Sequence, residues 1–215
     1  MTTRRRTEVG KGAFGRPRMH DEHAREVLRR ILARELPLTE DAVFLCLWHQ
    51  LTTRRHSQVL QKVRISKDVG GYQYFYFSPD IDLLEITPSQ KVIGYELKGY
   101  RKQARSVVPP QYYAGIDEAL AYLVNPVKSP SSASFAGSIF DEVWVVHPDG
   151  SGIGEMSDLI SRLTPLGIMT VNHSGVKTVV PAKPNPYLDQ ALKAQFLAHL
   201  DSFSTYRRFK VKPIQ

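Results

Sequence analysis

Two neighbouring segments decide the fold of this chain, residues 78–86 (SPDIDLLEI) and 91–99 (KVIGYELKG). Each is predicted to form an apolar strand that carries charged side chains, and the residues between them, TPSQ, predict a tight turn. Side chains alternate between the two faces of a strand, so Glu96 and Lys98 share one face about 7 Å apart, and Asp80 and Asp82 likewise share a face. A hairpin over this turn brings Asp82 beside the end of the strand that carries Glu96 and Lys98.

The patch formed in this way holds two or three carboxylates and one ammonium group. Carboxylate oxygens are the donor set that Mg²⁺ and Mn²⁺ prefer in proteins. The two strands therefore predict a divalent-cation site at the end where their charged residues meet.

Length and composition indicate a single domain of ordinary size over residues 19–215, preceded by a basic arm over residues 1–18. The chain has 215 residues, of which 42% are hydrophobic, and its formal net charge is +8. A positive surplus of this size favours an anionic partner, and nucleic acid is the commonest such partner. A basic surface kept for solubility is the alternative that composition leaves open.

The one cysteine, Cys46, lies in an apolar run, so neither an intrachain disulfide nor a zinc site built from cysteines can form. We expect Cys46 to be a small buried hydrophobic residue. No apolar run approaches the length of a membrane span, and the basic N-terminus lacks the apolar segment of a signal peptide. These features predict a cytoplasmic protein with no membrane partner.

Glycines in the basic arm, residues 10–15 (GKGAFG), have the spacing of a dinucleotide-binding motif. That motif requires a strand before it and a helix after it, whereas no strand is predicted here and Pro17 stands where the helix would begin. We interpret the arm as a flexible basic segment that contacts phosphate groups. A disordered terminus without a role is the alternative.

The rest of the pattern predicts alternating helices and strands. We expect helices at 20–36, 39–51, 111–123, 156–163 and 187–203, and strands at 59–65, 72–86, 91–98, 140–147, 168–172 and 176–181. Helix 111–123 is expected to bury Ile116, Ala119, Leu120 and Leu123, residues 99–105 to form a basic loop, and residues 125–137 to form a Pro/Ser-rich loop. Three sequential strands followed by a crossover helix and a buried strand predict an α/β fold, a mixed central sheet flanked by helices on both faces.

An E-x-K triplet is a weak signal alone, but here it ends an apolar strand, follows a Pro-Asp-x-Asp hairpin, and is preceded by a helix with an inward-facing Glu40. In this combination residues 38–148 resemble the PD-(D/E)xK nuclease superfamily, with its restriction-endonuclease-like and Holliday-junction-resolvase-like fold. The resemblance implies an αβββαβ core, here with extra N- and C-terminal helices, that holds one or two Mg²⁺ ions. It implies that Asp82 is the strand-two aspartate, that Glu96 and Lys98 are the E-x-K pair, and that Glu40 is the helix-one glutamate.

The assignments of Glu40 and Asp80 have alternatives within the chain. Asp80 matches the literal Pro-Asp pair but lies further from the hairpin than Asp82. Three other glutamates compete with Glu40, and one of them also falls on the apolar face of its helix. These rivals are Glu22, Glu26 and Glu35, the last being the inward-facing one.

Phosphodiester cleavage needs an activated water, neutralisation of the phosphate charge and a stabilised leaving oxygen. A Mg²⁺ ion held by Asp82, Glu96 and the main-chain carbonyl of Leu97 supplies all three. The nearby carboxylates favour the charged form of Lys98, so we assign Lys98 to orienting the water and stabilising the phosphate rather than to general-base catalysis. The expected function is a metal-dependent nuclease that hydrolyses DNA, with Mg²⁺ or Mn²⁺ as cofactor. Among nucleases, an endonuclease is the favoured kind.

Basic segments on either side of the predicted site are expected to hold the nucleic-acid backbone. Gln111 resembles a polar residue that is frequent on the family's second helix, although the Q-x-x-x-Y form of some branches is absent because residue 115 is glycine. A simple helix-terminal role is the alternative for Gln111. Analogy with the family also suggests a homodimer. The expected DNA-binding residues are Arg54, Arg55, Arg101, Lys102, Arg105 and Gln111.

Other interpretations of the charged strands remain open. Asp82 and Glu96 can pair with Lys98 and Arg101 as an ordinary ion cluster, because charged rows also protect the edges of sheets from aggregation. A nucleic-acid-binding module that has the fold without catalysis is the main functional alternative. A subunit whose sheet and basic tails serve protein assembly is the second.

Overall fold

The computed structural model describes residues 21–54, 57–64, 73–74, 81–103, 106–124, 127–128, 137–198, 200 and 204–205. The predicted basic arm at 1–18 lies outside the described residues, as do Asp80, Arg55 and Arg105 and most of the predicted loop at 125–137. The side chain of Arg54 is also outside this description.

The described chain contains both helices and strands. The helices are α1 (Asp21–Leu32), α2 (Glu40–Arg54), α3 (Ile116–Val124), α4 (Ser157–Leu163) and α5 (Gln190–Ala198), with a 3₁₀ helix η1 (Ile153–Met156) leading into α4. The strands of the main sheet are β1 (Gln58–Arg64), β3 (Ile81–Ile86), β4 (Val92–Leu97), β8 (Glu142–Pro148), β9 (Gly167–Asn172), β10 (Gly175–Val180) and the short β11 (Ser204–Thr205). Two small sheets pair β2 (Gln73–Tyr74) with β7 (Val127–Lys128) and β5 (Arg101–Gln103) with β6 (Ser106–Val108).

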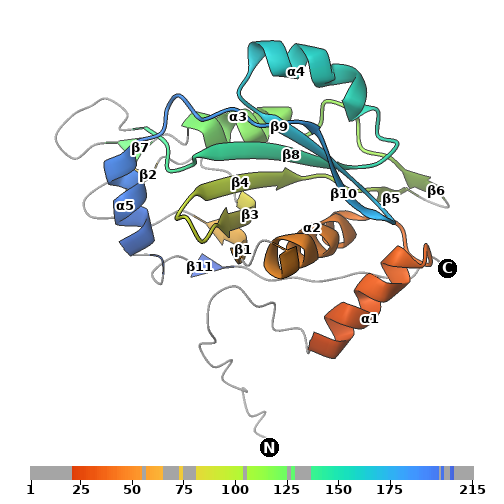
Figure 1. Cartoon of the computed structure of the whole chain (residues 1–215). Helices are drawn as coiled ribbons and strands as arrows, with labels where there is room; N and C mark the ends of the chain where they lie inside the picture. Colours follow the sequence, from red (N-terminus) through yellow and green to blue (C-terminus); the bar gives the residue numbers. More distant parts are fainter. Residues whose placement is uncertain are drawn as a thin grey trace, which may run out of the picture.

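The main sheet is mixed, and its strand order is β10-β9-β8-β4-β3-β1-β11 (Figure 1). Strands β1, β3 and β4 form an antiparallel meander. After α3 the chain adds β8 parallel to β4 and then β9 parallel to β8, and β10 returns antiparallel to β9. A parallel neighbour needs a crossover connection, and α3 and α4 provide the two that this sheet requires. The predicted mixed α/β class is therefore confirmed.

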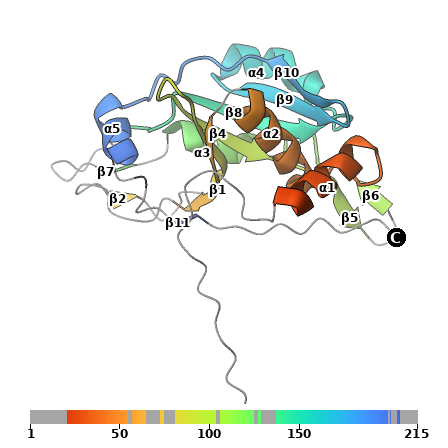
Figure 2. The same ribbon diagram turned by 60° about the horizontal axis from the view of Figure 1, so that its bottom comes forward.

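Helices cover both faces of the sheet because successive side chains of its central strands point to opposite sides (Figures 1 and 2). Along β8, Val143 and Val145 pack into one core with side chains of α3, α4 and α5. Trp144 and Val146 pack into a second core with α1 and α2. The second core also holds Cys46, and its burial raises the pKa of the thiol to about 11, as expected for an inert hydrophobic cysteine.

The predicted hairpin forms between β3 and β4. Leu83 pairs with Tyr95 and Ile86 pairs with Val92, so the same register continued by one step sets Asp82 opposite Glu96. Both strands are buried along their whole length. The apolar residues of the two strands thus force the carboxylates between them into the interior of the protein.

Several predicted boundaries were wrong, and the turn before α3 is the most informative. Helix α3 begins at Ile116 and not at Gln111, because Gly115 has a φ of +82°, a left-handed conformation that interrupts a helix. On α3, Leu120 is 39% exposed and not buried as predicted, and Tyr122 lies in the core instead. Residues 101–103, expected to belong to a basic loop, instead pair with 106–108 as the β5–β6 hairpin.

The two peripheral helices also differ from their predicted lengths. Helix α1 ends at Leu32, four residues before the predicted end at 36, since Arg34 takes a φ of +63° and reverses the chain. Helix α5 begins at Gln190 because the side chain of Asp189 accepts the Leu192 N–H at 2.9 Å and so caps the helix.

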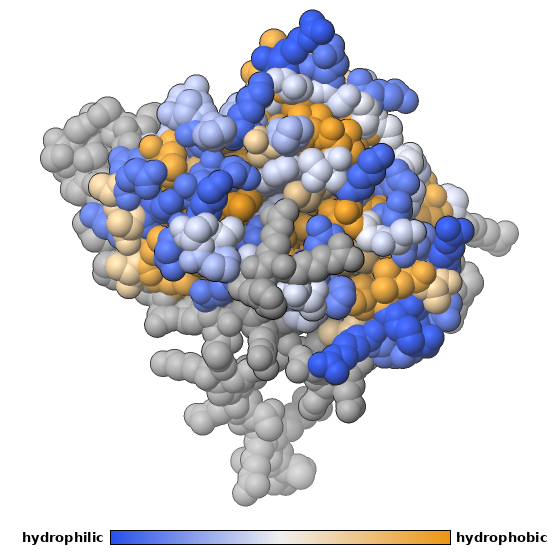
Figure 3. Space-filling model, in the orientation of Figure 1, coloured by the Kyte–Doolittle hydropathy of each residue, from blue (hydrophilic) through white to orange (hydrophobic). Residues whose placement is uncertain are grey.

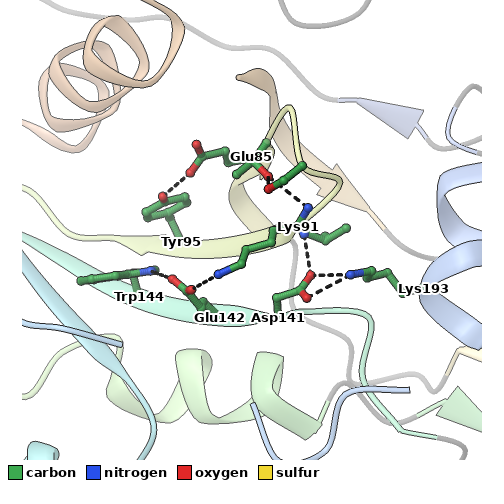
Figure 4. A network of polar contacts seen from close by, with 10 residues as sticks. Glu85, Lys91, Tyr95, Asp141, Glu142, Trp144 and Lys193 are labelled. Atoms are coloured by element: carbon green, nitrogen blue, oxygen red, sulfur yellow. Dashed lines mark hydrogen bonds and ion pairs between the residues drawn. The ribbon is translucent and has the colours of Figure 1, made fainter. Parts of the chain in front are cut away.

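Charged residues hold the end of β4 that carries the β3–β4 turn (Figure 4). The carboxylate of Asp141 accepts the Val92 N–H at 2.7 Å and the ammonium of Lys193 at 2.9 Å, which ties α5 to the sheet. Lys91 forms an ion pair with Glu142 at 3.0 Å. These pairs lie at the opposite end of β4 from Glu96.

No helix in the described part of the chain combines the length and the apolar character that crossing a bilayer requires. On the face drawn in Figure 3, apolar side chains form separate patches between hydrophilic ones.

The far end of β4 packs tightly against the start of α2. A Cβ atom added to Gly99 would lie 1.9 Å from the main-chain nitrogen of Glu40, so only glycine allows this approach. The next residue, Tyr100, donates its N–H to the Leu38 carbonyl at 2.8 Å. Gly99 therefore fixes where the N-terminus of α2 lies relative to the end of β4.

We expect Gly99→Ala to lower the free energy of unfolding by more than about 2 kcal/mol, because the added methyl group meets backbone that cannot rotate away. Gly154→Ala is the matched control, since a Cβ there meets nothing within 4 Å. Urea unfolding of both variants measures the difference. Equal midpoints for Gly99→Ala and the wild type would contradict this packing.

Candidate active site

Two buried carboxylates meet where β3 and β4 lie side by side. Asp82 is 5% exposed and Glu96 is 3% exposed. One oxygen of Asp82, Oδ2, accepts the main-chain N–H of Leu97 at 2.9 Å. The hairpin register brings these carboxylates together, as the sequence predicted, and each reaches the interior because it replaces an apolar residue in a buried strand.

Lys98 directly follows β4, and its ammonium lies between two carboxylates, one from β4 and one from α3. Its ammonium donates to Oε1 of Glu96 at 2.5 Å and also to Oε2 of Glu118 from α3. The side chain of Lys98 is 11% exposed and that of Glu118 is 44% exposed. The cluster therefore runs from a buried carboxylate, through the lysine, to a carboxylate that solvent reaches.

Helix α3 supplies the other side of the site. Tyr122 donates its hydroxyl to Oε2 of Glu96 at 2.5 Å. Glu118 and Tyr122 are four residues apart and so lie on one face of the helix. At the turn before α3, a Cβ on Gly115 would lie 2.7 Å from Cε of Lys98 and 2.9 Å from Cγ of Glu96, so the backbone of this turn closes directly over the site.

The turn is held from β8 by His147, which is fully buried. Its Nε2 lies 2.8 Å from the carbonyl of Ala114, and its Nδ1 lies 3.1 Å from the hydroxyl of Ser151. A carbonyl only accepts, so Nε2 carries the proton and Nδ1 accepts from the serine. Burial, assisted by the charge of Lys98, lowers the pKa of His147 to about 4, and the ring is neutral at pH 7.

The electrostatics of the site are dominated by an excess of buried negative charge. Burial, followed by the charge of Asp82 and a hydrogen bond with Glu118, raises the pKa of Glu96 to about 9, although Lys98 acts in the opposite direction. Without another cation, Glu96 therefore tends to retain a proton at neutral pH. A divalent cation that replaced this proton would relieve the repulsion between the two carboxylates.

Lys98 and Tyr122 respond to the same field. Burial would lower the pKa of Lys98, but the hydrogen bonds and charges of Glu118 and Glu96 outweigh it and raise that pKa above its usual value. Burial and the charges of Glu96 and Asp82 also raise the pKa of Tyr122 well above 10. At neutral pH the site thus contains a charged ammonium and a neutral phenol, both of which are hydrogen-bond donors.

Glu40 comes from the other side of the sheet. It opens α2, and its main chain lies against Gly99, three residues beyond Glu96 on the same strand segment. The structure therefore brings the start of α2 to the end of β4 that carries the site. Among the rivals of Glu40, Glu26 pairs with Arg29 within α1 at 2.7 Å. Glu35 lies exposed after the end of α1, where it pairs with Arg30 at 3.0 Å, so its expected inward place on a helix was wrong.

Of the residues predicted to bind nucleic acid, Arg101, Lys102 and Gln111 follow the end of β4 that carries the site, whereas Arg54 does not lie there. Arg101 and Lys102 are exposed on β5, just beyond Lys98. Gln111 is exposed in the turn before α3, and its carbonyl accepts the Ala114 N–H at 2.9 Å. Arg54 ends α2.

Sequence reasoning missed Glu118, Tyr122 and His147. The i, i+4 spacing of Glu118 and Tyr122 was available as a signal. Because Leu120 was assigned to the buried face of the helix, the predicted buried face did not include Tyr122. His147 gave no local signal, because its role depends on a turn about thirty positions earlier in the chain.

A third buried carboxylate lies on the opposite face of the sheet. Glu85 is fully buried and accepts hydrogen bonds from the hydroxyls of Ser57, at 2.6 Å, and Tyr95. Figure 4 shows Glu85 and Tyr95 facing each other. This network joins the start of β1 to the β3–β4 hairpin, and its complete burial gives it a structural role.

The donor set at Asp82 and Glu96 fits a hard divalent cation. Two carboxylates lie together with a surplus of negative charge, and the Leu97 main chain lies within hydrogen-bonding reach of Asp82. Within the described residues, no group of three or more His, Cys, Asp or Glu side chains is arranged to hold a metal ion. A cation here would therefore take its remaining ligands from the main chain, water or a substrate.

Comparisons of the chain with protein-family models, with curated proteins and with solved structures find no match.

We expect Glu96→Gln to stabilise the metal-free protein increasingly as pH rises. The native pKa of Glu96, about 9, exceeds the value of 4.5 for a free carboxyl group, so the unfolded chain releases the proton first and the wild type loses stability between these two values. Glutamine does not titrate. In a chelator, Glu96→Gln should match the wild type near pH 4.5 and exceed it by more than about 1 kcal/mol at pH 8. A difference that does not vary with pH would rule out the raised pKa.

Proposed function

We propose that this protein is a metal-dependent nuclease of the PD-(D/E)xK type, an endonuclease that hydrolyses phosphodiester bonds within DNA. The observation that carries the proposal is the buried pair Asp82 and Glu96 on adjoining strands, with Lys98 on the same face as Glu96. The order α2-β1-β3-β4-α3-β8 supports it, because it matches the αβββαβ core that the family resemblance implies.

Asp82 and Glu96, with the Leu97 carbonyl, are the groups that would hold a Mg²⁺ or Mn²⁺ ion. When bound, this ion supplies Lewis-acid activation of water and neutralisation of the phosphate charge. Tyr122 orients the carboxylate of Glu96 through its hydroxyl, and the Leu97 N–H orients that of Asp82. Partners of this kind fix the direction of ligands and raise their affinity for the ion.

Lys98 acts as a fixed positive charge. Its raised pKa keeps it protonated, so it cannot remove a proton from water at neutral pH. An ammonium in this position orients the attacking water and stabilises the negative charge that develops on the phosphate. Glu118 holds Lys98 from the solvent side, which makes it a positioning residue.

A second candidate is a nucleic-acid-binding module without catalysis. It is favoured by one observation, that Lys98 already has two carboxylate partners, Glu96 and Glu118, and forms a complete ion cluster with them. In that case the exposed Arg101 and Lys102 would bind the nucleic-acid backbone and the buried charges would serve the fold.

Binding of Mn²⁺ separates the two candidates. We expect calorimetry on the metal-free wild type to detect binding that tightens with rising pH and releases about one proton, because the ion displaces the proton from Glu96. Asp82→Asn and Glu96→Gln should lose this binding, whereas Lys91→Ala, at the other end of β4, should retain it. An absence of binding to the wild type argues for the non-catalytic module.

We expect the wild type to cleave DNA only when Mg²⁺ or Mn²⁺ is present, and Asp82→Asn, Glu96→Gln and Lys98→Ala to be slower by about 100-fold or more. The assay follows nicking of supercoiled plasmid and cleavage of linear duplex, single-stranded and branched DNA. Lys91→Ala is the control, since Lys91 pairs with Glu142 away from the site.

Two results would overturn the catalytic proposal. One is a wild type that cleaves none of these substrates. The other is cleavage by Glu96→Gln and Lys98→Ala at the wild-type rate, which would trace the activity to another source.

A further inference from the structure

Two adjacent tyrosines stand exposed beside the candidate site. Tyr112 is 46% exposed and Tyr113 is 50% exposed. Their rings contact each other edge to face, with centroids 5.2 Å apart and planes at 87°. In this arrangement each ring keeps at least one face clear of its partner, and the two clear faces point in different directions.

The turn that carries the tyrosines is rigid. The Ala114 N–H donates to the Gln111 carbonyl at 2.9 Å, and the Ala114 carbonyl accepts from His147 at 2.8 Å. Gly152, in the turn after β8, also approaches the first tyrosine, because a Cβ placed on it would lie 3.5 Å from Cβ of Tyr112. The backbone that carries the exposed rings is therefore held in place before any ligand binds, which reduces the entropy cost of binding.

This turn leads directly into the candidate site. Gly115, two residues after Tyr113, is the residue whose backbone closes over Lys98 and Glu96. On the other side, the β5–β6 hairpin carries the exposed Arg101 and Lys102 and is followed by the tyrosine turn along the chain. Exposed aromatic faces, basic side chains and the charged site thus follow one another on one segment, residues 96–115.

Aromatic faces and basic groups carried on one segment match the two parts of a single-stranded nucleic acid. Unpaired bases stack on aromatic rings, whereas the bases of a duplex are already stacked on each other and present only their edges. Basic side chains bind the phosphates of either form. The charge of the surface therefore favours nucleic acid in general, and the clear ring faces favour unpaired nucleotides.

We infer that Tyr112 and Tyr113 form a stacking platform for unpaired bases, which directs a single-stranded segment of DNA or RNA to the candidate site. The role of the platform in cleavage rests on the proposed nuclease function, whereas its binding of unpaired bases can be tested without any cleavage. It predicts that cleavage takes place in or beside unpaired nucleotides.

The test measures binding in a chelator, where no metal-dependent cleavage occurs. Fluorescence anisotropy gives the Kd for a labelled single strand of about 20 nucleotides, its duplex, an abasic strand of the same length, and the RNA version of the single strand. The variants are Tyr112→Ser and Tyr113→Ser, which remove the ring, with Tyr112→Phe and Tyr113→Phe as matched controls that keep it. Thermal melting checks that the fold is unchanged.

We expect each serine variant to bind the single strand about 10-fold more weakly, and the duplex and abasic strand within about 2-fold of the wild type. The phenylalanine variants should bind like the wild type. A loss shared by DNA and RNA single strands supports a platform that reads bases alone, and a loss confined to one of them supports the platform and identifies the sugar it accepts.

The inference is overturned if the serine variants bind the single strand with the wild-type Kd, or if their affinity for the abasic strand falls by the same factor. It is also overturned if the phenylalanine variants lose as much affinity for the single strand as the serine variants. Because these measurements need no metal, they separate the two ideas. Cleavage with no dependence on the tyrosines overturns only the platform, and tyrosine-dependent binding without cleavage overturns only the nuclease.

Discussion

The structure depends on how two buried carboxylates are accommodated on adjoining strands. Asp82 and Glu96 sit in strands whose apolar residues are buried on both faces, so neither can turn to solvent without moving the sheet. Burial and mutual repulsion act against their ionisation. The surrounding groups, the Leu97 N–H, Lys98 and the Tyr122 hydroxyl, offset part of this cost. The raised pKa of Glu96 indicates that these groups do not fully offset the burial and the repulsion of the two carboxylates. Uncompensated negative charge of this kind is what would attract a small cation.

Each compensating group reaches the site from a different element, and tight contacts hold those elements in place. The turn before α3 lies against Lys98 with no room for a side chain at Gly115, and His147 fixes that turn from β8. At the end of β4, Gly99 allows the start of α2 to approach. These contacts join the charged cluster to both helical layers. They also hold the backbone of the exposed turn at Tyr112 and Tyr113 beside the site, where the exposed ring faces of these tyrosines are the basis of their proposed binding role.

Much of the fold followed from local patterns. The β3–β4 hairpin, its register and the shared face of Glu96 and Lys98 are fixed by strand alternation and by a four-residue turn, both of which are readable in the sequence. The order of elements predicted the mixed sheet and its crossover helix. The errors occurred where one residue's backbone conformation decided the outcome. Gly115 and Arg34 adopt left-handed angles that shorten their helices, and residue type gives only a weak indication of such angles.

The sequence by itself determined the carboxylates, their lysine and the strands that carry them, because period-two alternation and the turn act over a few residues. The tertiary structure alone decided which groups surround them. Glu118 and Tyr122 enter the site through the rotation of α3, and His147 enters through the parallel pairing of β8 with β4. The raised pKa of Glu96 likewise arises only when the fold removes water from a pair of charges. Packing between distant segments sets burial and long-range contact, and no local pattern records either.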